Sequence, residues 1–276
     1  PLYFTQPLYS GLISKRRDVM HRLTKLIFLT LCGFGFGTSV LAQAGQGPGA
    51  LDDHGGWVVA AYVGGARTAA SSLSVSQPEL GNDLTFEGVR FRSRSFDPPL
   101  YYGLRGSYFA RRLPSLGIEA EFIHLKVFSN PQQRVRVAGL RRGLPVNGEL
   151  PLGEIVQQYS ISHGVNLLLF NVAARHGLGR NAKATGGWLV LTGRAGAGPT
   201  LPHTESSVEG RRQEQYEVGR LGWQAAGGAE LNLWRGLYLL GEYKFTRTRQ
   251  RGKVFSGTAE SLLRTHHGVF GLSYHF

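Results

Sequence analysis

The end of the chain alternates strictly between two kinds of side chain over residues 265–276. Aromatic or aliphatic residues occupy one face of the expected strand, and small or polar residues occupy the other. The first set is Phe270, Leu272, Tyr274 and the terminal Phe276, and the second is Thr265, His267, Gly271, Ser273 and His275. This pattern is typical of the last strand of a bacterial outer-membrane β-barrel, whose apolar side chains face lipid. The last strand of a soluble β-domain is the alternative interpretation.

Alternation of the same kind recurs along the chain and predicts eight strands. They are expected at 57–66, 100–110, 116–128, 159–176, 188–198, 220–234, 237–249 and 265–276. Eight is an even number, as single-chain bacterial barrels require. After residue 44 no apolar stretch reaches the roughly 18 residues of a transmembrane helix. The predicted fold class is therefore all-β, an eight-stranded antiparallel up-and-down transmembrane β-barrel.

The predicted connections alternate in length. Short turns are expected at 111–115, 177–187 and 235–236, and long links at 67–99, 129–158, 199–219 and 250–262. An up-and-down barrel with both termini in the periplasm has this order, with its long loops outside the cell. Within the first link, Leu84, Phe86, Val89 and Phe91 predict a hairpin that extends beyond the membrane.

The start of the chain resembles an export signal. The only methionine, Met20, precedes a basic segment, an apolar core at 26–41 and Ala42-Gln43-Ala44 as a cleavage site. We expect an upstream extension over 1–19, a signal peptide over 20–44 and an outer-membrane barrel domain over 45–276. The only cysteine, Cys32, lies in the signal, so the mature protein would lack disulfides and thiolate sites. Its formal charge falls from +13 to +9, because five Lys/Arg and one Asp are removed.

The lumen of an eight-stranded barrel is nearly filled by side chains, so a general diffusion pore is not expected. Charged and amide side chains on the inward face must then pair with one another. The residues concerned are Arg105, Glu119, Glu121, Asn171, Arg175, Arg194, Glu230, Glu242 and Lys244. A salt-bridge lattice is the main interpretation of this set, and catalysis is the alternative.

Histidines gather at the predicted extracellular rim. His124, His163, His203, His266 and His267 all fall near strand ends on that side, with Glu205, Glu217 and Asn166 at similar height. Imidazole and carboxylate groups that converge in this way can bind a divalent metal. Alternatively, histidine belongs to the interfacial belt, and His124 shares a strand face with Phe122.

Arginines are concentrated at the same rim. They are Arg90, Arg92 and Arg94 in the first link, Arg134, Arg136, Arg141 and Arg142 in the second, and Arg247, Arg249 and Arg251 with Lys253 near the last. Bidentate arginine suits the phosphates of lipid A, so lipid A or lipopolysaccharide is the expected partner of a monomeric protein. Arginines that merely stand among neighbouring lipopolysaccharides are the alternative. Nucleic acid is not expected, because no groove-reading element is present.

Several motifs carry a family resemblance that spans 56–276. They are Pro98 to Arg105 (PPLYYGLR), Gly117 to Val127 (GIEAEFIHLKV), His163-Gly164-Val165-Asn166, Gly196 to Pro199 with Pro202-His203, and Gly241-Glu242-Tyr243-Lys244. The chain resembles the outer-membrane lipid A oxidase family of rhizobia and their relatives. The resemblance implies oxygen-dependent oxidation of the proximal glucosamine of lipid A to 2-aminogluconate, with release of hydrogen peroxide and a requirement for a divalent cation.

The oxidation needs a redox centre, and the chain lacks a mature cysteine, a Rossmann glycine pattern and a flavin-binding motif, so a histidine-carboxylate metal site is the simplest choice. The expected catalytic residues are Glu121, His163 and His203, and the expected metal ligands are His163, His203, His267 and Glu217. The expected substrate-binding residues are Arg92, Arg94, His124, Lys126, Arg249 and Arg251. If the rim site fails, the carboxylates of Glu119 and Glu121 are the next candidates.

Two other functions stay open. A lipid A deacylase would use serine and histidine on one strand face, but Ser162 and His163 are adjacent and point to opposite faces, which disfavours it. A small structural or adhesive barrel whose loops bind partners is the non-enzymatic alternative.

Overall fold

The computed structural model describes residues 55–162, 164–179 and 187–276. The expected upstream extension and signal peptide lie outside these residues, as does His163. Helical structure within the described ranges is limited to two short 3-10 turns, η1 (Pro78–Leu80) and η2 (Leu152–Glu154). No helix among the described residues is long and apolar enough to cross a membrane.

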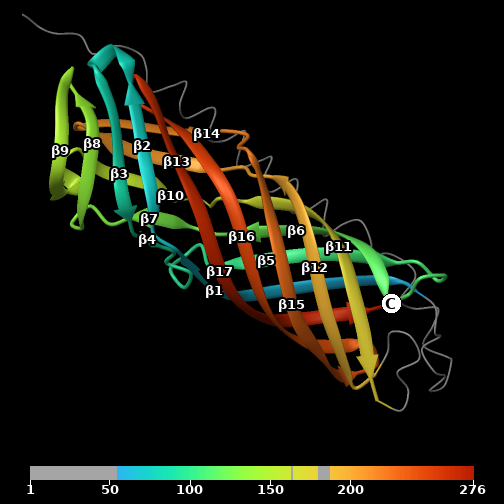
Figure 1. The fold of residues 1–276 in the computed structure, drawn as a ribbon. Coiled ribbons are helices and arrows are strands. Elements are labelled where there is room, and N and C mark those ends of the chain that lie inside the picture. Colours follow the sequence, from blue (N-terminus) through green and yellow to red (C-terminus); the bar gives the residue numbers. More distant parts are fainter. Residues whose placement is uncertain (1–54, 163, 180–186) are drawn as a thin grey trace, which may run out of the picture. The chain divides into compact units, whose positions relative to one another are not determined.

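Eight antiparallel strands close into a barrel (Figure 1), which confirms the predicted fold class. In order around the wall they are β1 (Trp57–Thr68), β5 (Tyr102–Phe109), β6 (Leu116–His124), β11 (Leu167–Leu178), β12 (Leu189–Pro199), β15 (Leu221–Trp234), β16 (Leu237–Val254) and β17 (Gly257–His275). The sheet closes because β1 pairs with β17 over eleven residues, from Val58 opposite His275 to Thr68 opposite Thr265. Closure leaves no unpaired edge in the wall.

The fourth predicted strand, 159–176, is wrong as a single element. It is divided into β10 (Val156–Ile161) and β11, which belong to different sheets. Between them Gly164 and Asn166 have positive φ angles of 100° and 47°. Backbone in this conformation cannot continue an extended strand, so the chain turns from one sheet into the other.

The connections sort into two ends of the barrel, which we call the short-turn end and the long-link end. At the short-turn end, β15 and β16 are joined by Arg235 and Gly236, both with positive φ, as a tight hairpin turn requires. At the long-link end, the link predicted at 250–262 is wrong, because β16 and β17 continue through it and turn only at Phe255-Ser256. Inward residues there remain buried and outward ones exposed, so the two-residue period extends past the wall.

The outer wall is apolar. Large hydrophobic side chains point outward from every strand, and Trp57, Phe170, Phe270 and Phe276 are each more than half exposed. Many charged side chains of the wall strands point inward and are buried, among them Arg105, Glu119 and Lys244, whereas Arg67, Arg247 and Arg264 near the long-link end are exposed on the outside. A closed barrel with an apolar exterior and a polar interior is the arrangement by which strands span a lipid bilayer.

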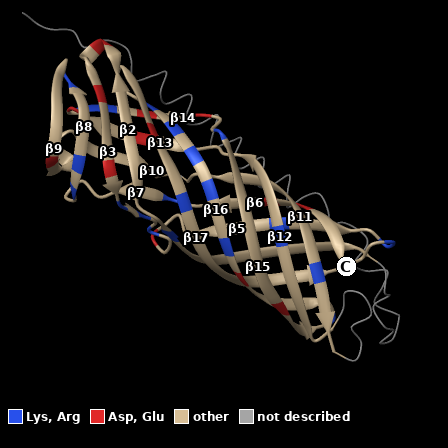
Figure 2. Cartoon of the chain, in the orientation of Figure 1, with Lys and Arg blue, Asp and Glu red and all other residues tan. Residues whose placement is uncertain are grey.

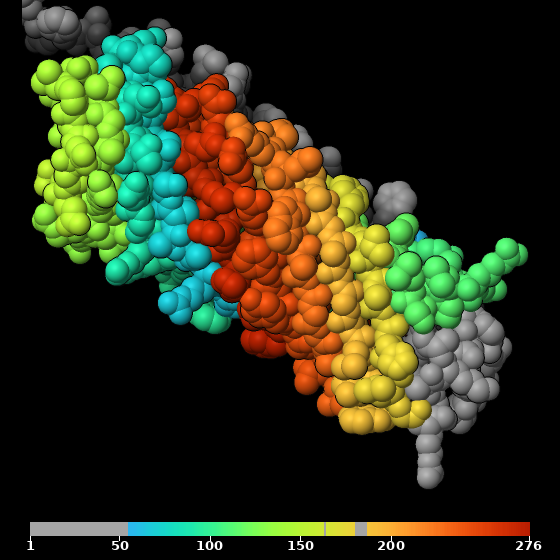
Figure 3. All heavy atoms as spheres, viewed as in Figure 1, coloured from blue at the N-terminus to red at the C-terminus, as the bar shows by residue number. Residues whose placement is uncertain are grey.

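Two sheets pack face to face at the long-link end. Strands β2 (Ser71–Gln77), β3 (Asn82–Val89), β8 (Arg134–Arg141) and β9 (Leu144–Pro151) extend the wall sheet from β17, as the successive bands of Figure 3 show. The second sheet has the order β14 (Arg211–Tyr216), β13 (His203–Val208), β10, β7 (Val127–Ser129) and β4 (Phe91–Arg92). We call this pair of sheets the cap.

A continuous apolar core fills the cap. It includes Leu73, Val75, Leu84, Phe86, Val137, Ile155, Val156, Ile161 and Val208, all at most 1% exposed. Leu84 and Phe86 lie in the β2–β3 hairpin, so the hairpin predicted from their alternation is confirmed. The links predicted at 67–99, 129–158 and 199–219 are therefore largely folded strands, which fix the positions of polar side chains at this end.

Candidate functional site

The barrel lumen holds an ion-pair lattice. Glu242 accepts two hydrogen bonds from Arg105 at 3.0 and 3.1 Å and forms ion pairs with Arg194 and with Lys244, the latter at 2.7 Å. Arg194 also lies 3.3 Å from Glu119, which accepts hydrogen bonds from Ser107 at 2.6 Å and from Asn171 at 2.9 Å. The lattice expected from the sequence is present for these residues, and it fills the lumen with paired groups. Arg175, expected in the same set, instead donates a hydrogen bond to the carbonyl of Pro114 at 2.9 Å and lies over the Phe109 ring, and it forms no ion pair with another described residue.

The structure places Glu121, a predicted catalytic residue, inside this lattice. Its carboxylate accepts a hydrogen bond from the hydroxyl of Tyr62 at 2.6 Å and others from Lys244 and Gln224, and its side chain has no exposed surface. A general base must come within hydrogen-bond reach of its substrate. Glu121 has no such access, so its geometry supports a structural role.

His267 and His124 have separate surroundings. Both ring nitrogens of His267 are already hydrogen-bonded inside the barrel, Nδ1 with the Tyr101 hydroxyl at 3.0 Å and Nε2 with the Thr246 hydroxyl at 2.9 Å. No nitrogen is left for a metal without breaking one of these bonds. The Nδ1 of His124 is hydrogen-bonded to Asn166 at 2.8 Å, and its ring stacks on Tyr102 at 5.1 Å between ring centres.

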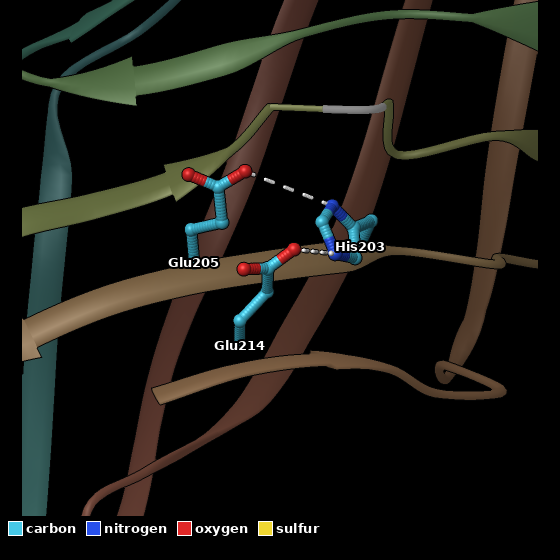
Figure 4. A group of neighbouring side chains, drawn as sticks. All are labelled: His203, Glu205 and Glu214. Atoms are coloured by element: carbon cyan, nitrogen blue, oxygen red, sulfur yellow. Dashed lines mark ion pairs between the residues drawn. The ribbon is translucent and has the colours of Figure 1, made fainter. Parts of the chain in front are cut away.

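One histidine is joined to two carboxylates on the cap. His203 Nε2 lies 3.1 Å from Glu214, and His203 Nδ1 lies 3.9 Å from Glu205 (Figure 4). The imidazole stacks on Tyr216 with ring centres 4.0 Å apart, and Ser162 donates a hydrogen bond to Glu205. One ligand atom from each of the three residues lies within 4.8 Å of the others. We call this group, His203, Glu205 and Glu214, the rim triad.

Strand pairing assembles the rim triad. Strands β13 and β14 form a hairpin in which Glu205 is directly opposite Glu214. The neighbouring Thr204 faces β16, because a Cβ on Gly252 would lie 2.7 Å from its methyl group. Side chains alternate along a strand, so His203 and Glu205 point away from β16 and hence away from the cap core. Within the triad Glu214 keeps 39% of its side-chain surface exposed, whereas Glu205 keeps 13% and His203 only 2%, so Glu214 is the member that is accessible from outside.

The donor atoms of the rim triad suit a divalent metal. Two carboxylates directly opposite one another are unfavourable unless positive charge lies near them. Arg212 approaches both, at 3.9 Å from Glu205 and 3.7 Å from Glu214, but its side chain is 67% exposed. One nitrogen and two carboxylate oxygens form a mixed donor set that transition metals accept. Among the described residues, this is the group of three whose ligand atoms converge in this way.

The sequence predicted His203 as a ligand and placed Glu205 nearby, but it missed Glu214. A signal was available, since His203 to Val208 and Arg211 to Tyr216 flank Glu209-Gly210, a typical hairpin turn with positive φ at both residues. Glu217, the predicted carboxylate ligand, is not part of the triad. It lines a groove of about 470 Å³ together with Arg220, Arg251 and Lys253.

The predicted substrate-binding residues are not gathered at one place. Arg92 is exposed on β4, and the guanidinium of Arg94 lies over the Phe128 ring at 4.6 Å. Lys126 donates hydrogen bonds to the carbonyls of Asp97 at 2.6 Å and Pro98 at 3.3 Å, so it supports the link before β5. Arg249 and Arg251 lie on β16 and line a second groove of about 520 Å³, in which Glu260 lies 3.4 Å from Arg249.

A charged clasp joins two hairpin turns of the cap. Glu209 accepts hydrogen bonds from Arg141 and Arg142, both at 2.8 Å. The hydrogen bond from Arg141 is the largest influence on this carboxyl and lowers the pKa of Glu209 below its ordinary value. Deeper in the cap, burial raises the pKa of the Tyr159 hydroxyl to about 12. The clasp therefore stabilises the cap while Glu209 is ionised, and the Tyr159 hydroxyl stays neutral.

Comparison with known proteins leaves the family of this chain open. No protein-family model matches it, and no curated protein is similar to it in sequence. Solved structures with some likeness include outer membrane protease OmpT from Escherichia coli, at 10% identity over 80% of this chain and 97% of that one, with a TM-score of 0.43. Outer membrane protein OprG from Pseudomonas aeruginosa is 9% identical over 81% and 97%, also with a TM-score of 0.43. Neisserial surface protein A is 12% identical over 80% and 96%, with a TM-score of 0.35. At these values the likeness assigns neither family nor function.

Proposed function

We propose that this chain is an outer-membrane enzyme that oxidises lipid A, with the rim triad as its metal centre. The observation that carries the proposal is the convergence of one imidazole and two carboxylates, with Glu214 partly exposed, on the cap at the long-link end of a closed, apolar-walled barrel. A filled lumen offers no route for transport, so chemistry at the cap is a more economical use of this fold.

The orientation follows from charge. The long-link end carries most of the exposed arginines, whereas the outer leaflet of a bacterial outer membrane displays the phosphates of lipid A. Arginine and phosphate form strong bidentate hydrogen bonds, so this end faces outside and the termini face the periplasm. The glycolipid headgroup then lies at the height of the cap.

The proposed reaction balances with molecular oxygen and one water, for a lipid A whose anomeric hydroxyl carries no phosphate. The anomeric C–H and O–H of the proximal glucosamine lose two electrons and two protons, which reduce oxygen to hydrogen peroxide. The resulting lactone adds water and opens to the 2-aminogluconate, so the lipid gains one oxygen atom. A metal held by His203, Glu205 and Glu214 would supply the redox and Lewis-acid chemistry that side chains alone lack.

The chain's own residues have positioning roles in this proposal. Glu214, the most exposed member of the triad, can accept the anomeric proton, and Tyr216 holds the imidazole of His203 by stacking. The adjacent groove of Glu217, Arg220, Arg251 and Lys253 carries three cations for a sugar phosphate or acid. Because Glu217 directly follows Tyr216, the groove begins where the triad's hairpin ends.

The test is mass spectrometry of lipid A from cells with and without this chain, in a host whose lipid A has a free anomeric hydroxyl. The parent should add one oxygen atom to lipid A, and His203→Ala and Glu214→Ala should abolish that gain while the barrel still folds. His176→Ala is the matched control, because His176 is exposed on the wall near the short-turn end. An unchanged oxygen gain in both triad variants would contradict the assignment.

A non-enzymatic barrel that binds lipopolysaccharide is the second candidate. It is favoured by the line of exposed basic residues along β16, from Arg247 to Lys253, which needs no catalysis to be useful. The same mass spectra separate the two candidates, because a binding protein leaves the mass of lipid A unchanged.

A further inference from the structure

A group of basic side chains lies on the outer face of β1, β16 and β17. Arg247 of β16 is directly opposite Arg264 of β17, and Arg67 of β1 is directly opposite His266 of β17. All four side chains are exposed. Lysines and arginines follow β16 and continue onto β17 in Figure 2. We call Arg67, Arg247, Arg264 and His266 the wall cluster.

The wall cluster lacks acidic partners. Within the described residues, Arg67, Arg247 and Arg264 form no ion pair. Ion pairs begin only farther along the strands toward the cap, where Glu260 lies 3.4 Å from Arg249 and 3.5 Å from Arg220. Like charges directly opposite one another on a sheet are destabilising. Three arginines placed together without a carboxylate therefore carry uncompensated positive charge, which an anion from outside the chain can neutralise.

The height of the wall cluster matches a lipid headgroup. Ten residues of β16 separate Leu237, opposite Tyr274, from Arg247. At about 3.3 Å per residue and a tilt near 40°, this distance spans roughly 25 Å, the height of the apolar band of an outer-membrane barrel. Aromatic side chains lie beside and just below the cluster, with Trp223 opposite Arg247 and Phe245 opposite His266. The hydroxyl of Tyr243 is hydrogen-bonded to His266 Nδ1 at 2.5 Å.

A shallow depression lies directly below the cluster. Gly65 of β1 is opposite Gly268 of β17, and Tyr243 of β16 is opposite Gly268 on its other side. A Cβ added to Gly268 would meet nothing within 4 Å, and one added to Gly65 would meet only the Phe96 ring, at 3.9 Å. An acyl chain can therefore lie against bare backbone at this place, with its headgroup at the arginines.

We propose that the wall cluster is a binding site for a phosphorylated glycolipid of the surrounding leaflet, with lipid A as the ligand. Arg67, Arg247 and Arg264 bind a phosphate group, and the Gly65–Gly268 depression receives one acyl chain. The site lies on the wall strands, whereas the rim triad lies on β13 and β14, and the inference does not rest on oxidase activity. Such a site anchors the barrel to one lipid and sets its depth in the membrane.

The test measures lipid binding to the purified barrel in dodecyl maltoside micelles by native mass spectrometry. The double variant Arg247→Gln/Arg264→Gln should bind bisphosphorylated lipid A at least tenfold more weakly, because charge-assisted contacts to phosphate are lost. The matched control is Arg111→Gln/Arg112→Gln, which removes the same charge from exposed residues at the short-turn end. The control should bind as tightly as the parent.

Two further arms identify the ligand. Gly268→Leu fills the depression with a side chain whose Cβ meets no neighbour within 4 Å, so it should weaken lipid A binding several-fold and leave the heat-resistant gel mobility of the barrel unchanged. Lipid A stripped of phosphate should bind at least tenfold more weakly than the bisphosphorylated form. Equal binding of the stripped lipid, equal weakening by the control, or full displacement by millimolar inorganic phosphate would each overturn the proposal, since the site would then be nonspecific or a simple anion site. None of these outcomes bears on lipid A oxidation.

Discussion

Lys244 is the cation whose removal tests the lumenal lattice most sharply. Its side chain has no exposed surface, and its ammonium pairs with both Glu121 and Glu242. In Lys244→Met the stem is replaced by a side chain of similar volume, so packing is kept and the charge is lost. The cations Arg105, Arg194 and Lys244 pair with Glu119, Glu121 and Glu242, and Glu230 lies 3.7 Å from Arg105 and 2.7 Å from His275, so the variant removes one cation from a set that already holds four carboxylates.

Breaking a buried ion pair in this way costs about 3–5 kcal/mol. The lower end applies here, because Glu121 keeps its hydrogen bond from Tyr62 and lies 3.8 Å from Arg105. A loss of about 3 kcal/mol lowers the folding equilibrium constant by a factor on the order of one hundred. Urea titration of the barrel in lipid vesicles, followed by tryptophan fluorescence and gel mobility, measures this change as a lower midpoint at constant slope.

A second substitution separates charge from packing. Adding Glu121→Gln to Lys244→Met restores the balance of charges, so the double variant should be more stable than Lys244→Met alone. Lys253→Met is the control, because Lys253 is exposed and its loss should change stability by no more than about 0.5 kcal/mol. A cost below about 1 kcal/mol for Lys244→Met, or strict additivity of the two lumenal changes, would refute the lattice as a source of stability.

Three other predictions concern the cap and the barrel. The pKa of Glu209 is lowered in the folded state, so its clasp stabilises the cap fully above the ordinary glutamate pKa of about 4.3 and is lost as pH falls through the folded value. Glu209→Gln should therefore lower the protection of the turn at 141–144 against hydrogen exchange at pH 6, relative to the intrinsic exchange rate at that pH, and equal protection in parent and variant would contradict this. Protease added to intact cells should cut at Arg211-Arg212 and spare Arg111-Arg112, whereas cleavage confined to the latter would reverse the orientation. The folded barrel should resist dodecyl sulfate until boiled, since its strands pair into a closed wall, and identical gel mobility before and after boiling would count against it.

The wall strands could be predicted from sequence because the alternation of apolar and polar residues in each strand shows which side chains face lipid and which face the lumen. The two-residue period from Leu237 to Arg249 and from Thr265 to Phe276 reflects burial on one face only, so no knowledge of neighbouring strands is needed. The same period continues beyond Arg249, with Gln250, Gly252 and Val254 pointing inward. The charged residues that alternate with them are typical of loops, which is why a loop was predicted at 250–262. Beyond the bilayer, an outward arginine side chain is solvated, so Arg249 and Arg251 can remain in the backbone hydrogen-bonded pairing of β16 with β17.

The candidate site was only partly predictable, because it depends on pairing between distant segments. His203 stood out as a residue type, but its contact with Glu214 depends on the hairpin of β13 and β14, and the direction of its side chain depends on Thr204 packing against Gly252. His267 and Glu121 could not be assigned from spacing, since their partners Tyr101 and Lys244 lie far away in sequence. Local alternation gives the face of a side chain and leaves its partners undetermined.

The most direct measurement of the central claim uses the purified barrel, lipid A with a free anomeric hydroxyl, dissolved oxygen and one divalent metal at a time. Product lipid is weighed by mass spectrometry while hydrogen peroxide is followed by a coupled colour assay. The proposal predicts a gain of one oxygen atom per lipid A, one hydrogen peroxide released with it, and loss of both signals in Glu214→Ala but not in His176→Ala. Unchanged lipid A and no peroxide with every metal, from a barrel that is folded by gel mobility, would contradict it.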